Sequence, residues 1–262
     1  MKLINLSQKI KRSNILQKQL FFLPHNNLIM SNKRQNKSQK ELVEELINCG
    51  TIKTKEVEQA MFQVDRSDFI NNDPYIDAPQ QIGYNVTISA PHMHAYSLSY
   101  LQKQLTSGKP VRVLDIGCGT GYLCPAFLMM IPIQFRQQST IVGIDHVKEL
   151  VQLSYNNIRK SFSQELEKKQ IILVTGDGRE GYQQLAPYDA IHVGAAAEKI
   201  PEALLQQLNF GGRMVIPVGK HNGHQEFLAI DKDQEGKITQ TKLFGVQYVP
   251  LTSLEKQLGP NQ

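Results

Sequence analysis

Short apolar runs recur through the second half of the chain, and each of them ends in glycine or aspartate. They lie at residues 111–117, 140–145, 170–178, 188–195 and 213–219. Between several of them stand segments whose apolar residues recur at helical spacing, at 122–131, 147–162 and 201–208. Strands that alternate with helices predict an α/β fold, a doubly wound and mostly parallel sheet with helices on both faces.

The last part of the chain has a different pattern. Residues 227–233 and 238–251 are two further apolar runs that no helical segment separates. Neighbouring strands joined by a short turn pair antiparallel. We therefore expect a seven-stranded sheet that finishes with antiparallel strands near the C-terminus.

The first half of the chain predicts two helices and a loop. Ser38 is followed three residues later by Glu41, which is capping-box spacing, and Gly50 is expected to end this helix. A second helix is expected over residues 55–64, with Thr54 as its cap. Residues 65–86 are rich in Asp, Asn and Pro, which favour turns. Long loops of this kind inside a domain are often functional.

The bulk composition is that of a soluble globular protein, with 40% hydrophobic and 20% charged residues among 262. No apolar run approaches the roughly 18 to 20 residues that span a bilayer, so we expect no membrane partner. The three cysteines are an odd number without C-x-x-C spacing, which indicates a reducing intracellular compartment. We expect a monomer in the cytoplasm.

The basic residues are unevenly distributed. Residues 1–40 carry nine of the 29 basic residues and no acidic one, which leaves 20 basic against 24 acidic residues in the remainder. A mildly acidic body argues against a nucleic-acid partner, because phosphate binding needs a basic face. The arm over residues 1–37 is read as a disordered extension, as an organelle-targeting peptide, or as the product of an upstream start with Met30 as the working initiator. Residues 38–262 are expected to form one domain.

A glycine-rich turn follows the first strand of the predicted sheet, in "VLDIGCGTGY". Gly117, Gly119 and Gly121 let the chain turn tightly and let a ligand approach the backbone. The spacing G-x-G-x-G differs from the dinucleotide fingerprint G-x-G-x-x-G, and the Gly-Lys-Ser/Thr of a phosphate loop is absent. Ligands of doubly wound sheets bind at the carboxyl ends of the strands.

The next two strands also end in acids. Asp145 ends the second strand, where a carboxylate can accept hydrogen bonds from both hydroxyls of a ribose, and Asp177 with Gly178 ends the third, beside the expected adenine. Three successive strand ends of this kind resemble a class I S-adenosylmethionine-dependent methyltransferase, a Rossmann-like fold.

A closer resemblance covers residues 40 to 257. Seven motifs carry it: "TISAPHMHA", "VLDIGCGTGYL", "VGIDHVKELV", "GDGREGY", "APYDAIHVGAAA", "GGRMVIPVG" and "YVPLTSLEKQ". They recur in this order in the protein-L-isoaspartate (D-aspartate) O-methyltransferase family, which the chain resembles. Residues 65–91 resemble the substrate-facing segment of that family. This divides the domain into residues 38–110, with the N-terminal helices and the substrate-facing segment, and residues 111–262, with the cofactor-binding sheet. The loop departs from the family at Cys118 and Thr120, where serines are common.

The resemblance implies an enzyme that binds S-adenosyl-L-methionine, releases S-adenosyl-L-homocysteine and uses no metal. Ser89 is the position that the family treats as its active-site serine. The implied cofactor contacts are Val86, Thr87, Ile88, Ser89, His94, Asp115, Gly117, Gly119, Gly121, Asp145, Asp177, Gly178, Thr252 and Gln257. The implied substrates are isoaspartyl-containing proteins and peptides, methylated on the free α-carboxylate, with the D-aspartyl side chain as an open addition. The methyl ester then closes to a succinimide, which reopens partly to normal aspartate.

This chemistry asks little of the protein. A carboxylic acid with a pKa of about 3.9 is ionised at neutral pH, so the nucleophile needs no general base. What remains is to align oxygen, methyl and sulfur and to exclude water. Ser89 is then expected to hold the substrate by hydrogen bonds.

Other roles for these residues are weaker. A Ser89–His94 nucleophile pair lacks an aspartate to orient the imidazole. His92 and His94 lie two residues apart and point to different faces of a helix that begins near Pro91, so they do not predict a metal site. His94 is a cofactor contact by resemblance and a satisfied polar residue by spacing, while His146 and His192 are expected to pack or cap.

Two other functions stay open at this point. One is methyl transfer to a nucleic-acid base or a small molecule, although the Asn/Asp-Pro-Pro-Tyr/Phe type of motif is replaced by "HVGAAAEKIP" after the fourth strand. The other is a non-catalytic adaptor that uses the basic arm as its contact.

Overall fold

The computed structural model describes residues 36–259, which belong to a compact unit formed by residues 35–262. The N-terminal arm expected over residues 1–37 lies outside the described residues, apart from Asn36 and Lys37. No helix between residues 36 and 259 combines the length and the apolar character needed to cross a membrane.

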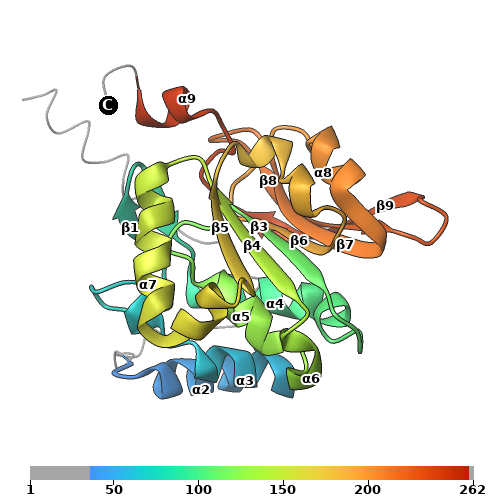
Figure 1. The fold of residues 1–262 in the computed structure, drawn as a ribbon. Coiled ribbons are helices and arrows are strands. Elements are labelled where there is room, and N and C mark those ends of the chain that lie inside the picture. The colour runs from blue at the N-terminus through green and yellow to red at the C-terminus, as the bar shows by residue number, and fades with distance from the viewer. Residues whose placement is uncertain (1–35, 260–262) are drawn as a thin grey trace, which may run out of the picture. The chain divides into compact units, whose positions relative to one another are not determined.

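A seven-stranded sheet forms the centre of this unit (Figure 1). Its order is β5-β4-β3-β6-β7-β8-β9. The strands are β3 Arg112–Ile116, β4 Thr140–Asp145, β5 Ile171–Thr175, β6 Tyr188–Val193, β7 Leu208–Gly219, β8 Gln225–Lys232 and β9 Ile238–Val246. Strands β3 to β7 pair in parallel, and β8 pairs antiparallel with both β7 and β9. The predicted mostly parallel sheet with an antiparallel end is confirmed.

The two faces of the sheet bury different side chains. In β3, Val113 packs into the apolar cluster that includes residues of α4 Pro91–Leu105, α5 Leu123–Met130 and α7 Lys148–Glu167. Leu114, its neighbour, packs into a second cluster, with Leu204 of α8 Glu202–Gln207. This alternation follows from the two-residue period of a strand. Burial of both faces explains why the strand sequences are continuously apolar.

Of the N-terminal helices, α3 packs against α5, and α2 packs against α3 (Figure 1). Helix α2, Gln39–Asn48, begins as predicted, since the Ser38 hydroxyl accepts a hydrogen bond from the Glu41 amide, and Gly50 follows its end with φ of +78°. Helix α3, Lys55–Gln63, begins after Thr54, but the Thr54 hydroxyl does not cap it. That hydroxyl instead donates to Gln102 Oε1 of α4 at 2.7 Å, which ties the two helices together.

The segment predicted as a loop contains a short hairpin. Strands β1 Gln80–Gly83 and β2 Val86–Ile88 pair antiparallel across a turn at Tyr84 and Asn85, whose φ angles are +51° and +59°. Two-residue hairpin turns with both central φ angles positive favour Asn and Gly. Tyrosine at the first of these positions is a weak signal, which explains why the pattern predicted turns without a hairpin. The remaining short elements are η1 Arg66–Asp68, α6 Ile133–Arg136, η2 Gly178–Glu180, η3 Gln183–Leu185 and α9 Leu254–Leu258.

Candidate functional site

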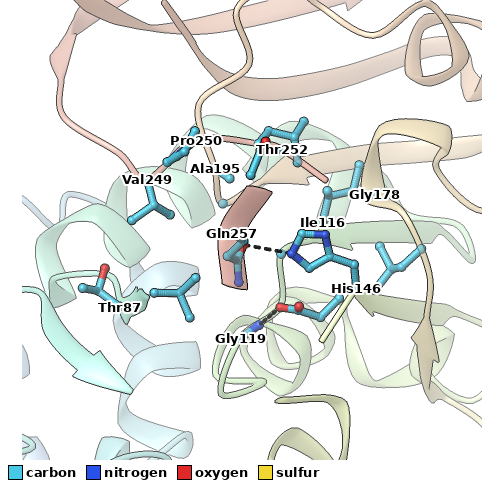
Figure 2. A pocket seen from close by; sticks show the side chains of 16 residues that line it. Thr87, Ile116, Gly119, His146, Gly178, Ala195, Val249, Pro250, Thr252 and Gln257 are labelled. Carbon is cyan, nitrogen blue, oxygen red and sulfur yellow. Dashed lines mark hydrogen bonds between the residues drawn. The ribbon is translucent and has the colours of Figure 1, made fainter. Parts of the chain in front are cut away.

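A cavity opens at the carboxyl ends of β3, β4 and β6, where the strand order reverses (Figure 2). The position is the one at which doubly wound sheets bind ligands. Its empty volume is about 550 Å³, part of which is open to solvent. The lining residues are Val86, Thr87, Ile116, Gly117, Gly119, Ile144, Asp145, His146, Gly178, Gly194, Ala195, Val249, Pro250, Leu251, Thr252 and Gln257.

The glycine loop forms the floor of this cavity. Gly117, Gly119 and Gly121 have φ angles of +70°, +55° and +87°, a region that residues with a Cβ rarely adopt. The amides of Gly117 and Cys118 both donate to the Ile144 carbonyl, at 2.9 and 3.1 Å, and this fastens the loop to β4. The tight turn predicted from the G-x-G-x-G spacing is therefore confirmed.

Gly178 packs against the same floor. A Cβ at this position would lie 2.3 Å from Ile116 Cγ2, which leaves no room for any side chain. A glycine here keeps the cavity wide enough for a flat ring to lie against the backbone. The residue therefore fits the predicted position beside adenine.

Asp145 is the acid that reaches the cavity. Its Oδ2 accepts a hydrogen bond from the Gly119 amide at 3.2 Å, and its Oδ1 accepts one from the Val147 amide at 3.0 Å. Burial raises the pKa of Asp145, and these two amides and the charge of His146 oppose the rise. A carboxylate has about four lone-pair sites, so acceptor capacity remains for ribose hydroxyls.

The roof of the cavity joins three segments through Gln257. Its side-chain oxygen accepts a hydrogen bond from His146 Nε2 at 2.8 Å (Figure 2). Its side-chain nitrogen donates to the Tyr84 carbonyl at 3.1 Å. Asn85 Nδ2 donates to the Gln257 carbonyl at 2.8 Å. Helix α9 and the β1–β2 turn are thus fastened over the end of β4. The sequence reading of His146 as a packing or capping residue missed this contact, because its partner lies far along the chain.

One wall comes from the segment after β9. The Ala196 amide donates to the Val249 carbonyl, and the Leu251 amide donates to the Ala196 carbonyl, both at 2.8 Å. On the other side, the buried Gln225 side chain accepts from the Tyr248 amide at 2.7 Å and donates to the Tyr248 carbonyl at 3.2 Å. These contacts hold residues 248–251 along the cavity. Sequence reasoning did not single out Val249, Pro250 or Leu251, since apolar residues after a strand carry no ligand signal.

Several residues predicted as cofactor contacts lie outside the lining of this cavity. Ile88 packs in the apolar core and is 4% exposed. Gly121 lies against Ser154 and Ile158 of α7, at the far end of the glycine loop. Asp177 caps η2 and pairs with Arg179, whose hydrogen bonds hold the pKa of Asp177 below its usual value. No contact with a cofactor tests these assignments, and they stay predictions.

Asp115 lies deeper, beneath the glycine loop. It is 1% exposed, and its Oδ1 is 2.7 Å from Nδ1 of His192. Its Oδ2 accepts a weaker hydrogen bond from the Cys124 thiol at 3.6 Å. Asp115 and His192 therefore join β3 to β6 directly below the site.

Ser89 and His94 lie together beside the cavity. The Ser89 carbonyl accepts a hydrogen bond from Arg66 Nη2 at 2.8 Å, and His94 Nδ1 is 3.2 Å from Arg66 Nη1. The His94 ring stacks on Tyr122, with ring centroids 4.5 Å apart. Burial, together with the charge of Arg66, holds the pKa of His94 well below its usual value. His94 is a neutral imidazole bound to a guanidinium, which does not support the alternative of a Ser89–His94 nucleophile pair.

The other histidine of the motif has a separate partner. His92 Nδ1 lies 2.8 Å from Asp77 Oδ1, and the His92 amide donates to the same oxygen at 2.9 Å. The two histidines therefore face different neighbours, as their spacing predicts. Between residues 36 and 259, no group of three or more His, Cys, Asp or Glu residues is arranged to hold a metal ion.

The strand order and the position of the cavity define the class of this protein, a class I S-adenosylmethionine-dependent methyltransferase. The model of the protein-L-isoaspartate(D-aspartate) O-methyltransferase family matches residues 36–256, which is most of the chain. The chain therefore belongs to the protein-L-isoaspartate(D-aspartate) O-methyltransferase family.

Individual relatives agree with this assignment. A protein-L-isoaspartate O-methyltransferase of Caenorhabditis elegans is 49% identical over 221 residues, covering 84% of this chain and 95% of the relative. Protein-L-isoaspartate O-methyltransferase 1 of Arabidopsis thaliana is 48% identical over 222 residues, covering 84% of this chain and 93% of the relative. A Plasmodium falciparum crystal structure, assigned as the same enzyme and solved in complex with S-adenosyl-L-homocysteine, superposes with a TM-score of 0.77 at 34% identity, covering 83% of this chain and 99% of that one.

Membership of this family establishes the activity and the cofactor of the chain. The chain is an S-adenosylmethionine-dependent enzyme that methylates isoaspartyl residues for protein repair. The fold and function predicted from the sequence are confirmed. The readings as a base or small-molecule methyltransferase and as an adaptor are wrong.

Proposed function

We propose that the cavity holds S-adenosylmethionine and that the adjoining segment at Ser89 holds the free α-carboxylate of an isoaspartyl residue. The observation that carries this proposal is the course of β2. Val86 and Thr87 line the cavity, while Ser89, two residues further on, lies against Arg66. One short strand therefore connects the cofactor site to the substrate site.

The residues of the cavity fit the cofactor. Asp145 keeps acceptor capacity for the ribose hydroxyls, and Gly178 leaves space for the adenine beside Ile116. Thr252 and Gln257 approach from the roof, and the glycine loop brings the backbone close from below. When bound, the cofactor supplies a methyl group on a positively charged sulfur.

The protein's own part in the reaction is orientation. The substrate carboxylate is already ionised at neutral pH, so no residue has to remove a proton from it. This agrees with His94, which is neutral, buried and bound to Arg66 instead of being free to act as a base. Ser89 then serves as a hydrogen-bonding residue that aligns the carboxylate oxygen with the methyl group.

Three finer assignments belong to the same proposal. The D-aspartyl side-chain carboxylate is a second substrate of the same site. The protein acts as a monomer in the cytoplasm, with targeting to an organelle by the basic arm as the alternative. Mass spectrometry of the N-terminus of native material would distinguish a cleaved arm from a retained one.

A pair of peptides tests the proposal directly. The full chain is incubated with methyl-labelled S-adenosylmethionine and an isoaspartyl peptide, beside the same peptide with normal aspartate. We expect base-labile methyl ester on the isoaspartyl peptide alone when both C-termini are amidated, because an internal isoaspartyl residue is then the one residue with a free α-carboxylate. A D-aspartyl version of the peptide tests the second substrate. Equal labelling of the isoaspartyl and normal peptides, or labelling of neither, would overturn the assignment of the Ser89 segment.

A further inference from the structure

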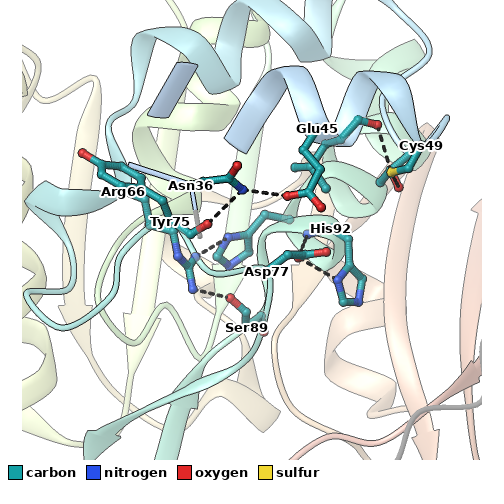
Figure 3. A network of polar contacts seen from close by, with 11 residues as sticks. Asn36, Glu45, Cys49, Arg66, Tyr75, Asp77, Ser89 and His92 are labelled. Carbon is teal, nitrogen blue, oxygen red and sulfur yellow. Dashed lines mark hydrogen bonds and ion pairs between the residues drawn. The ribbon is translucent and has the colours of Figure 1, made fainter. Parts of the chain in front are cut away.

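Arg66 is the largest fully buried side chain in the part of the chain that the structure describes. It lies on η1 and is 0% exposed, and its guanidinium meets the backbone of Ser89 (Figure 3). Removing a guanidinium from water is costly unless a carboxylate pairs with it. The partners of Arg66 therefore decide what this charge is for.

The described contacts of the guanidinium are all with neutral groups. Nη2 donates to the Ser89 carbonyl at 2.8 Å, and Nη1 lies 3.2 Å from His94 Nδ1. The guanidinium carbon is 5.8 Å from the centroid of the Tyr122 ring. Within residues 36–259, Arg66 Nε has no hydrogen-bond partner. The guanidinium is thus a buried cation whose described direct contacts are a carbonyl, an imidazole and a phenol, with no carboxylate among them.

The acid whose charge acts on Arg66 is engaged with another residue. Asp77 Oδ1 accepts hydrogen bonds from the amide and from Nδ1 of His92, at 2.9 and 2.8 Å (Figure 3). Burial lowers the pKa of Arg66 to about 10, and the negative charge of Asp77 works against this fall. Arg66 thus remains protonated at neutral pH without an ion pair to a residue of the described chain.

Arg66 also determines the tautomer of His94. Because the guanidinium only donates, His94 Nδ1 is the acceptor of this contact, and the imidazole proton lies on Nε2. Stacking on Tyr122 at an interplanar angle of 18° holds the ring in that orientation. One cation therefore orders two residues of the TISAPHMHA segment, the backbone of Ser89 and the ring of His94.

We propose that Arg66 is a positioning residue for the anionic substrate: it holds Ser89 in place, and its unpaired charge favours a carboxylate beside that residue. This inference rests on the proposed function, in which an isoaspartyl α-carboxylate lies at Ser89. Methyl transfer neutralises the carboxylate, so a nearby positive charge stabilises bound substrate more than the transition state. The charge of Arg66 should accordingly lower KM without raising kcat.

Two substitutions separate the charge from the shape. Arg66→Lys keeps a cation but loses the forked donor, and Arg66→Met loses both while keeping much of the volume. Both variants are expected to show a lower kcat than the unchanged chain, because Ser89 is less firmly held. KM for the isoaspartyl peptide should be about tenfold higher in Arg66→Met than in Arg66→Lys, the size expected for one lost charge interaction in a partly buried site, with the same kcat in both.

The controls identify a merely structural effect. Affinity for S-adenosyl-L-homocysteine, measured by calorimetry, should stay the same in both variants, since Arg66 does not line the cavity. Arg112→Met removes a charge from an exposed residue at the opposite end of β3, and its KM should not change. Arg66→Gln repeats the neutral substitution with a side chain that still donates, in case Arg66→Met does not fold.

Different failures have different meanings. Equal KM values in the lysine and neutral variants would overturn the role of the charge while leaving the proposed function intact. A fall in kcat and in cofactor affinity together, with KM unchanged, would show a structural role and would also overturn it. Absence of isoaspartyl methylation in the unchanged chain would overturn the proposed function, and the role of Arg66 with it.

Discussion

Single residues of the site each satisfy a local and a functional requirement. The carboxylate of Asp145 accepts hydrogen bonds from the Gly119 and Val147 amides, which holds the glycine loop against β4. Its remaining acceptor sites face the cavity. Buried carboxylates are stable when their oxygens are hydrogen-bonded, so a ribose would complete what the two amides begin. Arg66 is the opposite case, since the described hydrogen-bond partners of this buried charge are neutral.

Substitution of Asp145 tests the ribose contact. Asp145→Ala should weaken S-adenosyl-L-homocysteine binding by about 1 to 3 kcal/mol, because charge-assisted hydrogen bonds are lost. In the unchanged chain, affinity should fall as acid protonates Asp145, and this fall should begin above the usual range for aspartate because burial raises the pKa of Asp145. In Asp145→Asn the affinity should not fall with acid in this way, because asparagine does not titrate. Calorimetry between neutral and mildly acidic pH measures both effects, and an unchanged affinity in Asp145→Ala would contradict the assignment.

Two short elements, far apart in the sequence, close the site. Helix α9 is only five residues long, and the β1–β2 hairpin has strands of four and three residues. Neither buries a large apolar surface of its own, and such elements depend on tertiary contacts. The contacts of Gln257 with Tyr84, Asn85 and His146 supply the connection between them. Because Gln257 and His146 line the cavity, we expect cofactor release to depend on these contacts.

Loss of the Gln257 side chain should loosen this roof. Gln257→Ala removes two hydrogen bonds, each worth about 1 kcal/mol, and we expect faster release of S-adenosyl-L-homocysteine with up to roughly thirtyfold weaker affinity. Glu255→Ala, an exposed residue on the same helix, is the matched control and should release the product at the original rate. Stopped-flow measurement of release compares the two. Identical rates in both variants would remove Gln257 from the roof.

At the scale of the whole molecule, the basic excess and the family match lie in largely different parts of the chain. The basic excess lies in the first 40 residues, whereas the family model begins at residue 36. Every residue that lines the cavity lies at position 86 or beyond. The first described helix also carries its own cap, because the Ser38 hydroxyl accepts from Glu41. We therefore expect the catalytic unit to fold and act without the arm.

Removal of the arm tests this separation. A chain that starts at residue 36 should fold and should keep its kcat and KM for an isoaspartyl peptide within about twofold, as expected for an independent domain. A chain that ends at residue 253 is the informative counterpart, because it lacks Gln257 and should lose cofactor affinity. Thermal melting and methyl transfer are measured on both. Loss of activity on removal of the arm alone would assign it a part in the site.

Much of the fold was predictable because it depends on local patterns. The apolar runs that end in Gly or Asp correspond to β3 to β7, and the run without helices corresponds to the antiparallel β8 and β9. The hairpin at Tyr84 was not predicted, since its positive φ angles are forced on a residue that does not favour them. Arg66 was not singled out either, because a basic residue in a polar loop is normally exposed.

The amino-acid sequence by itself determined the alternation of strands and helices, the glycine turn after β3 and the acid at the end of β4. These features depend on periodicity, on backbone freedom and on residues close together in the chain. Only the tertiary structure decided that Gln257 meets Asn85 over the cavity, or that Arg66 is buried against Ser89. Such contacts join residues distant in sequence, and burial and hydrogen bonding select them only after the sheet and its helices have packed.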